Sequence, residues 1–241
     1  MDLGALVMSL ADSSGFELGR VGLGFARAAP AVTLVPAFGL KAVPAPVRLT
    51  FALFLALAIS PAFPPVDVAV PWPSALLTEV LRGMPVAVAA AVPLYVASQL
   101  GGLVDGLRGS NAQVQLPVVE GATTPLGGLF GLLAGAIFLS SGGPSRVATA
   151  LLVASPVDAA LLVRVTHDLL SGISLAIAVG APLLAASAVL EVALALIARA
   201  ATPTNVQVLL APIRGGGLLV VTALLLDRLG AALGLLVQRG F

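Results

Sequence analysis

The chain has no cysteine and only one histidine, His167, among its 241 residues. Without cysteine it can form no disulfide, no thiolate metal site and no cysteine nucleophile, and a single histidine argues strongly against a histidine-ligated metal. Charged residues are also scarce, at 10% of the chain against about a quarter in soluble domains. The net charge is +1 and no run of basic residues is present. We therefore expect no metal, no cofactor and no nucleic-acid partner.

Apolar surface is what the sequence has in abundance: 59% of the residues are hydrophobic and the mean hydropathy is +1.11. A soluble chain of this length could not bury so much apolar surface, so most of it has to face lipid or other apolar protein. Lipid offers no partners for backbone polar groups, which leaves helices or closed barrels. Segments such as "FALFLALAIS" (51–60) lack the alternation of barrel strands. We predict an all-α membrane protein in contact with membrane lipid.

About six apolar helical segments are expected. Charge-free stretches near or above the roughly 18–20 residues that span a bilayer are 49–66, 83–104, 121–145 and 169–190. The segments 21–40 and 206–226 are further candidates, each with a single arginine. The run 147–163 contains Pro156 and Asp158, which favours a partly buried or re-entrant segment.

Two carboxylates, Glu79 and Asp105, are candidate intramembrane charges at the ends of one apolar segment. Glu79 with Arg82, and Asp105 with Arg108, have the i, i+3 spacing of neighbours on a helix. Each pair can therefore neutralise locally. The favoured interpretation is that both pairs lie at the membrane interface and reach toward the lipid headgroups.

A third carboxylate, Glu191, is the only charge between residues 169 and 198. A carboxylate within a membrane span is a candidate for function. It is either a proton- or ion-coupling site or, more simply, an interhelical structural contact. Arg199 lies two turns away, about 12 Å along a helix, and is too far to pair with it directly.

Three glycines, Gly127, Gly131 and Gly135, follow one another at four-residue intervals in an apolar run. On a helix they form a stripe along which another backbone can approach closely. The stripe packs either against another helix of this chain or against a partner subunit, and both alternatives stay open.

The stretch "ALIARAATPTNVQVLLAPI" (195–213) predicts a tight helical hairpin. Pro203 cannot continue the preceding helix, and Thr204 or Asn205 is a good N-cap for the next one. Arg199 is placed to interact with the C-terminal dipole of the first helix. Pro212 predicts a kink in the second helix.

Arg164, His167 and Asp168 form the one polar group that invites a catalytic interpretation. No nucleophile motif such as G-x-S-x-G accompanies them, and no second histidine or carboxylate cluster completes a metal site. We interpret the trio as a solvated helix end and expect no enzyme.

The hairpin stretch resembles the FliR/SctT (SpaR/YscT-like) family, the export-gate proteins of bacterial flagella and type III secretion injectisomes. The positions that match in place are Arg199, Ala200, Ala201, Asn205, Val206 and Pro212. Thr202 stands where the family usually has proline, and Gln207 stands where an aromatic residue is usual.

Further matches follow in the family's order over about residues 21–226. They are Arg27 with Pro36, Phe38 and Gly39; "VPAPVR" (43–48); Glu79 with Gly83; Gly101, Asp105 and Gly109; and "TPLGGLFGLLAGAIFLSSGG" (124–143). The histidine that often follows the last of these segments is missing.

The resemblance implies bent helical hairpins, with residues 1–165 similar to a FliP/SctR subunit and residues 166–241, a C-terminal hairpin, similar to a FliQ/SctS subunit. It implies FliP/SctR-like, FliQ/SctS-like and FlhB/SctU-like partners and unfolded secreted proteins as substrates. It also implies a multi-pass location in the bacterial inner (cytoplasmic) membrane, within the basal body of the secretion system.

The polar loop 105–125 matches the family region that plugs the closed export channel. Residues 106–124 are glycine-rich and polar, with one arginine and one glutamate, so they could fold into a lumen and be displaced at low cost. A disordered external loop is the simpler alternative. Polar loops of about twenty residues are usually either functional or disordered, so both alternatives stay open. The candidate plug residues are Gly106, Leu107, Arg108, Gly109, Ser110, Asn111, Gln113 and Gln115.

A small secondary transporter is the alternative function. In that interpretation Glu191, with helices broken near Pro182 and Pro212, forms a substrate site at the middle of the membrane. Half-to-half internal similarity would favour it, and the sequence shows none.

Overall fold

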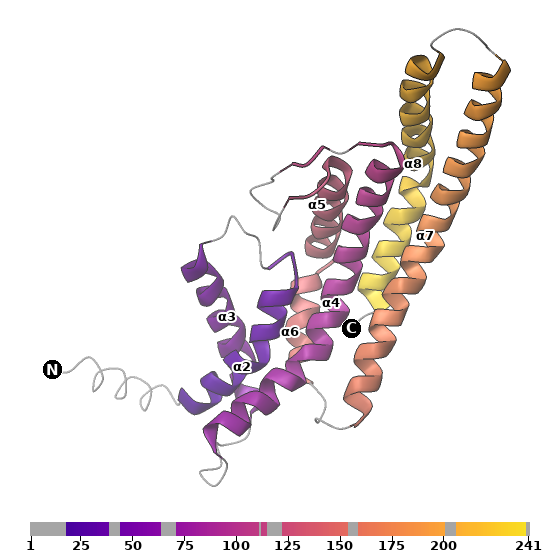
Figure 1. The fold of residues 1–241 in the computed structure, drawn as a ribbon. Coiled ribbons are helices and arrows are strands. Elements are labelled where there is room, and N and C mark those ends of the chain that lie inside the picture. The colour runs from indigo at the N-terminus through magenta and orange to yellow at the C-terminus, as the bar shows by residue number, and fades with distance from the viewer. Residues whose placement is uncertain are drawn as a thin grey trace. The chain divides into compact units, whose positions relative to one another are not determined.

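The computed structural model describes residues 18–38, 44–63, 71–110, 112–114, 122–153, 159–200 and 206–239. Over these ranges the regular elements are helices, and an isolated β-bridge joins Val114 to Thr123. The helices are α2 (Leu18–Leu34), α3 (Ala45–Ile59), η1 (Ser60–Ala62), α4 (Trp72–Leu107), α5 (Pro125–Ser140), α6 (Gly143–Leu152), α7 (Ala159–Ala200) and α8 (Val206–Arg239) (Figure 1). The predicted all-α class is confirmed.

In the part of the chain that the structure describes, three helical segments are long and apolar enough to cross a membrane: Ala45–Ala62, Trp72–Leu107 and Ala160–Ala200. The bent pair α5 and α6 makes a fourth candidate. The chain is therefore a multi-pass membrane protein with fewer candidate spans than the six apolar segments suggested. One reason is that α2 has only 17 residues and is about 25 Å long, short of the roughly 30 Å hydrocarbon core.

A sharp bend lies just before the segment 147–163, which was predicted to be partly buried or re-entrant. That segment contains the end of α6 and the start of α7; Val147 and Leu151 are buried, and Pro156 and Asp158 lie outside the described residues. The 65° bend falls between α5 and α6. There Gly142 has a φ of 77°, a left-handed conformation that glycine adopts without a Cβ clash.

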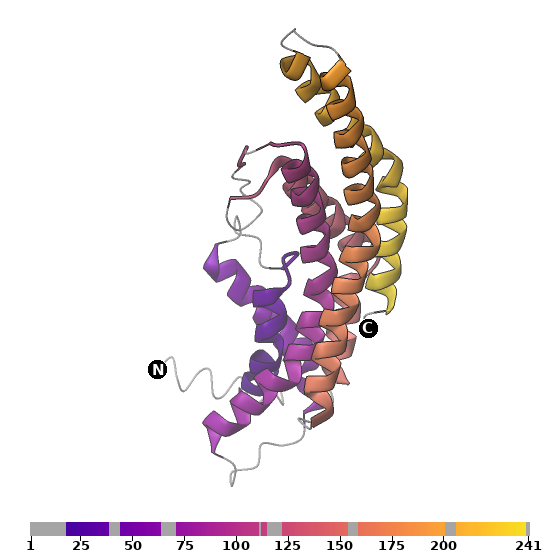
Figure 2. The same ribbon diagram turned by 45° about the vertical axis from the view of Figure 1, so that its right-hand side comes forward.

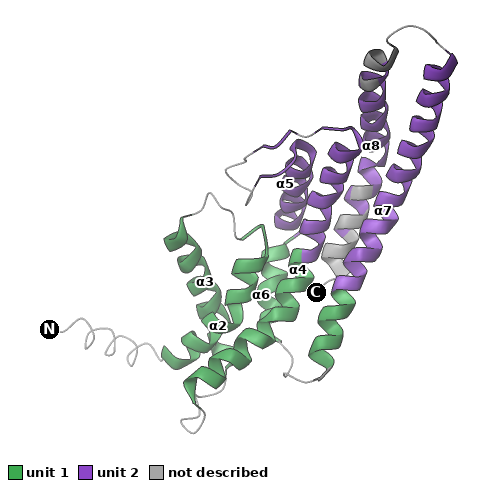
Figure 3. Cartoon of the chain, viewed as in Figure 1, with its two compact units in different colours: residues 1–91, 142–168, 241 green, residues 92–141, 169–240 purple. Residues whose placement is uncertain are grey.

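The first compact unit contains residues 1–91, 142–168 and 241 (Figure 3). Within it α2 packs against α3, and α6 packs against both. Small residues allow this packing, because a Cβ at Gly24 would lie 2.8 Å from the carbonyl oxygen of Ala56. Ile59, Val147 and Leu151 are fully buried in the core of the chain.

The second compact unit contains residues 92–141 and 169–240 (Figure 3). Within it α5 packs against α8. The C-terminal part of α4 lies directly against the start of α5, since a Cβ at Gly101 would lie 2.2 Å from the carbonyl oxygen of Leu126. No side chain larger than hydrogen fits at residue 101 without a shift of backbone.

The two compact units are defined by packing, whereas the division into 1–165 and 166–241 rests on resemblance to two other proteins. The boundary between residues 165 and 166 lies inside α7. Compactness does not test a division based on resemblance, so this division stays a prediction.

The C-terminal hairpin consists of α7 and α8, which run side by side in Figures 1 and 2. Arg199 lies in the last turn of α7, as predicted, while Pro203 and Asn205 lie outside the described residues. Pro182 and Pro212 lie inside α7 and α8, and both helices continue through them. The two helices are curved in Figure 2.

Candidate functional site

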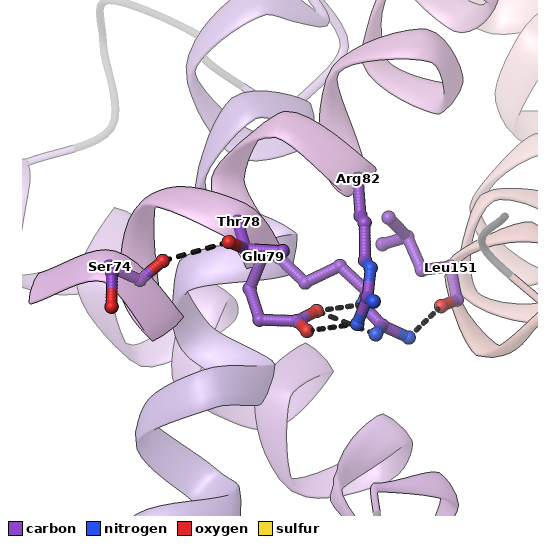
Figure 4. A network of polar contacts seen from close by, with 6 residues as sticks. Ser74, Thr78, Glu79, Arg82 and Leu151 are labelled. Carbon is purple, nitrogen blue, oxygen red and sulfur yellow. Dashed lines mark hydrogen bonds and ion pairs between the residues drawn. The ribbon is translucent and has the colours of Figure 1, made fainter. Parts of the chain in front are cut away.

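A buried ionic network joins α2 to α4 in the first unit (Figure 4). Arg27 Nε donates a hydrogen bond to Glu79 Oε2 at 2.7 Å, and Arg27 Nη2 forms an ion pair with the same oxygen at 2.5 Å. Arg82 Nη1 donates to Glu79 Oε1 at 2.5 Å, which confirms the predicted local pair. Glu79 is only 5% exposed, so the expectation that it snorkels is wrong. Its charge is stabilised by two guanidinium groups inside the protein instead of by lipid headgroups.

Arg27 has two further contacts that extend the network to α6 and to the end of η1. Its Nη1 donates to the backbone oxygen of Leu151 at 3.0 Å, in the last turn of α6. This carbonyl has no partner within its own helix, and a positive charge is favourable at a helix C-terminus. The guanidinium also lies 4.1 Å from the centre of the Phe63 ring, a cation–π contact. One side chain therefore links four segments of the first unit.

Gly83 allows α2 and α4 to approach closely enough for this network. A Cβ at Gly83 would lie 2.0 Å from the backbone oxygen of Arg27, so any larger residue pushes the two backbones apart. Sequence reasoning used Arg27 and Gly83 only as matching positions of the family pattern. The available signal was the single arginine in the otherwise apolar segment 21–40, which needs a buried acidic partner.

A second buried carboxylate, Asp105, lies at the C-terminal end of α4 and is 0% exposed. Its Oδ1 accepts a hydrogen bond from Arg108 Nη2 at 2.8 Å, the predicted local pair. Its Oδ2 accepts one from the backbone N–H of Leu126 at 2.7 Å, in the first turn of α5. Snorkelling is again wrong, because the carboxylate is buried between the two ends of the loop that joins α4 to α5.

The five candidate plug residues before Asn111 form the last residues of α4 and the cap that follows it. Gly106 and Leu107 are the last residues of α4. The N–H of Gly109 bonds to the oxygen of Gly106 at 3.0 Å, and the N–H of Ser110 bonds to the oxygen of Asp105 at 2.9 Å. Gly109 has a φ of 73°. This is a Schellman cap, whose left-handed residue is usually glycine.

The two arms of the loop pair further along the chain. Val114 N–H donates to the oxygen of Thr123 at 2.7 Å, and Thr123 N–H donates to the oxygen of Val114 at 3.1 Å. Gln113, next to this bridge, is exposed, while Asn111 and Gln115 lie outside the described residues. Only the ends of the predicted plug are therefore described, and both ends are held by hydrogen bonds.

The glycine stripe of α5 faces α4 over part of its length. A Cβ at Gly127 would lie 3.0 Å from the backbone oxygen of Ser98, and one at Gly131 would lie 3.5 Å from the Ser98 Cβ. Packing within the chain is confirmed for these two residues. Nothing lies within 4 Å of a Cβ at Gly135, so its predicted role at an interface stays a prediction. Sequence reasoning missed Gly101 as the closest-fitting partner of this stripe.

Glu191 forms an interhelical ion pair, as the simpler of its two interpretations expected. Its partner is Arg214 of α8, at 2.5 Å, and the two side chains are 51% and 37% exposed. Arg199 was correctly excluded as its direct partner. The sequence signal for Arg214 was that it is the single charge of segment 206–226.

The trio of α7 shows a loose arrangement. His167 Nδ1 lies 3.9 Å from Asp168 Oδ1, and the histidine side chain is 81% exposed. Among the described residues, no group of three or more His, Asp or Glu could hold a metal ion. His167 is solvated, as the sequence suggested, whereas Asp168 is only 29% exposed and the trio lies in the second and third turns of α7 and not at its end.

A protein-family model matches most of the chain. The family model described as "Bacterial export proteins, family 1" matches residues 18–239. None of the curated proteins matches the chain. The family match covers every helix described above.

Proposed function

This chain belongs to the bacterial export proteins, family 1, and is a membrane component of a bacterial export apparatus of the flagellar or type III secretion kind; from this premise we propose that it is a core subunit of the export gate. In this role it helps to form, and to plug, the channel that unfolded substrates cross. Its role is to assemble with the other gate subunits, and it catalyses no reaction of its own.

The length of the apolar surface on α7 carries this proposal. The helix has 42 residues and is about 63 Å long. Exposed apolar side chains extend along it from Leu162, 69% exposed, to Ile197, 50% exposed, roughly 50 Å apart. The hydrocarbon core of a bilayer is about 30 Å thick, so lipid covers little more than half of this surface. Other apolar protein has to cover the rest.

Long helical hairpins of neighbouring subunits fit this requirement. FliP/SctR-like and FliQ/SctS-like subunits are the proposed neighbours, with an FlhB/SctU-like subunit as a further partner. The proposed cellular location is the bacterial inner membrane, within the basal body of the secretion system. The division into a FliP/SctR-like part, 1–165, and a FliQ/SctS-like part, 166–241, belongs to the same proposal.

Native mass spectrometry after mild detergent extraction tests the gate proposal. The chain is co-expressed with candidate FliP/SctR-like and FliQ/SctS-like partners from its own genome. We expect a discrete complex with one copy of this chain and several copies of each partner. A chain that extracts alone or as a homodimer in the presence of both partners would refute the proposal.

The polar loop between α4 and α5 is the proposed plug. Support comes from its composition and from its two ends, which the bonds at Asp105 and the Val114–Thr123 bridge hold close together. Deleting Gly109–Val118 should make the assembled gate leak ions while assembly survives. Ion flux through the purified complex in liposomes is the measurement, and an intact barrier after the deletion would count against the plug.

The transporter alternative has less support from the contacts of its key residue. Glu191 already forms an ion pair with Arg214 of α8, at 2.5 Å, so its carboxylate serves a contact between two helices of the chain. Glu191-dependent substrate uptake by the chain reconstituted without partners would favour the transporter over the gate.

A further inference from the structure

Asp105 connects two parts of the chain that are 21 residues apart in sequence, the end of α4 and the start of α5. Both oxygens of its carboxylate are used, one by the Arg108 guanidinium and one by the Leu126 N–H. The residue is fully buried. A buried carboxylate without these partners would be strongly unfavourable, so the three groups stay together as long as the loop ends do.

The position of Asp105 indicates that it serves the loop and not its own helix. An acidic residue in the last turn of a helix faces the negative end of the dipole and is unfavourable there. At the first turn of α5 the same carboxylate meets the positive end and satisfies one of the free N–H groups of that helix. Thr124 satisfies another, since its Oγ1 accepts from the N–H of Gly127 at 3.2 Å.

We propose that Asp105 is the positioning residue of the loop: its carboxylate latches the start of α5 to the end of α4 and so holds the two ends of the loop together. The inference rests on the proposed function, because it assigns a role within the plugged gate. The cap at Gly109 belongs to α4 alone. Loss of the contact between Leu126 and Asp105 would therefore leave the end of α4 capped.

Three substitutions in the assembled gate compare how much ion leakage follows from the loss of each contact of Asp105. Asp105→Ala removes both contacts and should leak ions at a rate within about threefold of the Gly109–Val118 deletion. Asp105→Asn keeps an acceptor for the Leu126 N–H but turns an amide NH₂ toward Arg108, and Arg108→Ala removes that contact alone. Both of these should leak less than Asp105→Ala and more than the unaltered gate.

Glu191→Gln is the matched control. It also removes one carboxylate from an ion pair with an arginine in the second unit, and it lies outside the loop. We expect its gate to be as tight as the unaltered one.

Hydrogen–deuterium exchange of the same complexes measures the bond from the Leu126 N–H to Asp105 independently of leakage. The Leu126 amide should exchange at least tenfold faster in Asp105→Ala than in the unaltered gate. Amides of α4 before Gly101 should not change. A positioning role predicts this local effect, whereas general destabilisation would raise exchange in both places.

The outcomes separate the latch from the plug. A tight Asp105→Ala gate beside a leaking deletion overturns the latch and leaves the plug standing. If neither variant leaks, the plug is wrong, and unchanged exchange at Leu126 then overturns the latch as well. Where Asp105→Ala fails to assemble, Asp105→Asn takes its place, and an Asn variant equal to the unaltered gate in leakage and exchange refutes the proposal.

Discussion

Glu79→Ala tests whether the buried network of the first unit stabilises the fold. The substitution removes the one carboxylate between two guanidinium groups, so Arg27 and Arg82 are left facing each other without a counter-charge. Arg27 keeps its bond to the Leu151 oxygen and its contact with Phe63. Neither of these neutral partners can balance a buried charge.

The expected loss is set by the burial of the pair. The side chains of Arg27 and Glu79 are 8% and 7% exposed. Removing one partner of a buried ion pair costs about 3–5 kcal/mol in free energy of unfolding, because the other charge stays buried and unpaired. Arg82 is more open to solvent, at 32% exposure. We therefore expect Arg82→Ala to cost only about 1 kcal/mol or less, the usual range for a solvent-exposed pair.

Equilibrium unfolding of the purified chain in mixed detergent micelles with increasing SDS measures these differences. The chain has a single tryptophan, Trp72, which is a natural fluorescence probe of the first unit. A Cβ at Gly22 would lie 3.6 Å from the Trp72 ring, so its emission reports on the contact between α2 and α4. Glu191→Ala, at the half-exposed pair of the second unit, is the control and should cost no more than about 1 kcal/mol.

The double variant Arg27→Met with Glu79→Leu distinguishes a buried charge from lost packing. Replacing a buried pair by apolar side chains of similar volume is often neutral or stabilising, so the double variant should be more stable than Glu79→Ala. A Glu79→Ala loss below 1 kcal/mol, equal to that of Glu191→Ala, would refute the reasoning. So would a double variant less stable than the single one.

Further substitutions at three positions probe the second unit. Gly101→Ala places a methyl group 2.2 Å from the Leu126 oxygen and should lower the free energy of unfolding by about 1–3 kcal/mol in the same unfolding assay. Gly135→Ala enters open space and should be neutral or stabilising by up to about 1 kcal/mol. Equal losses at the two glycines would contradict the close contact of α4 with α5. Thr124→Ala removes the cap of α5 and should lower the free energy of unfolding by about 0.5–2 kcal/mol. Thr124→Ser keeps the hydroxyl and should be as stable as the unaltered chain. An equal loss in the serine variant would show that the hydroxyl does not stabilise α5.

Much of the fold could be predicted because its signals are local. Apolar runs bounded by charges, proline and glycine marked the positions of α3, α4, α5, α7 and α8. The i, i+3 spacing correctly paired Glu79 with Arg82 and Asp105 with Arg108, since helix geometry alone makes such residues neighbours.

The surroundings of those pairs could not be predicted in the same way. Arg27 lies 52 residues before Glu79, and no spacing rule connects the two. The bond from Leu126 to Asp105 uses a backbone N–H, a group that every residue except proline carries and that leaves no mark in the sequence. The snorkelling expectation failed for this reason: the partners that bury both carboxylates come from other segments.

The sequence by itself determined the class of this protein. A chain with 10% charged and 59% hydrophobic residues belongs in an apolar environment, where only helices and closed barrels satisfy their backbone polar groups, and its apolar runs lack the alternation of barrel strands. Tertiary structure alone decided which charges are buried, which glycines touch another backbone and which group holds the loop ends together. These depend on distances between segments far apart in the chain, and such distances are set by packing and not by local order along the sequence.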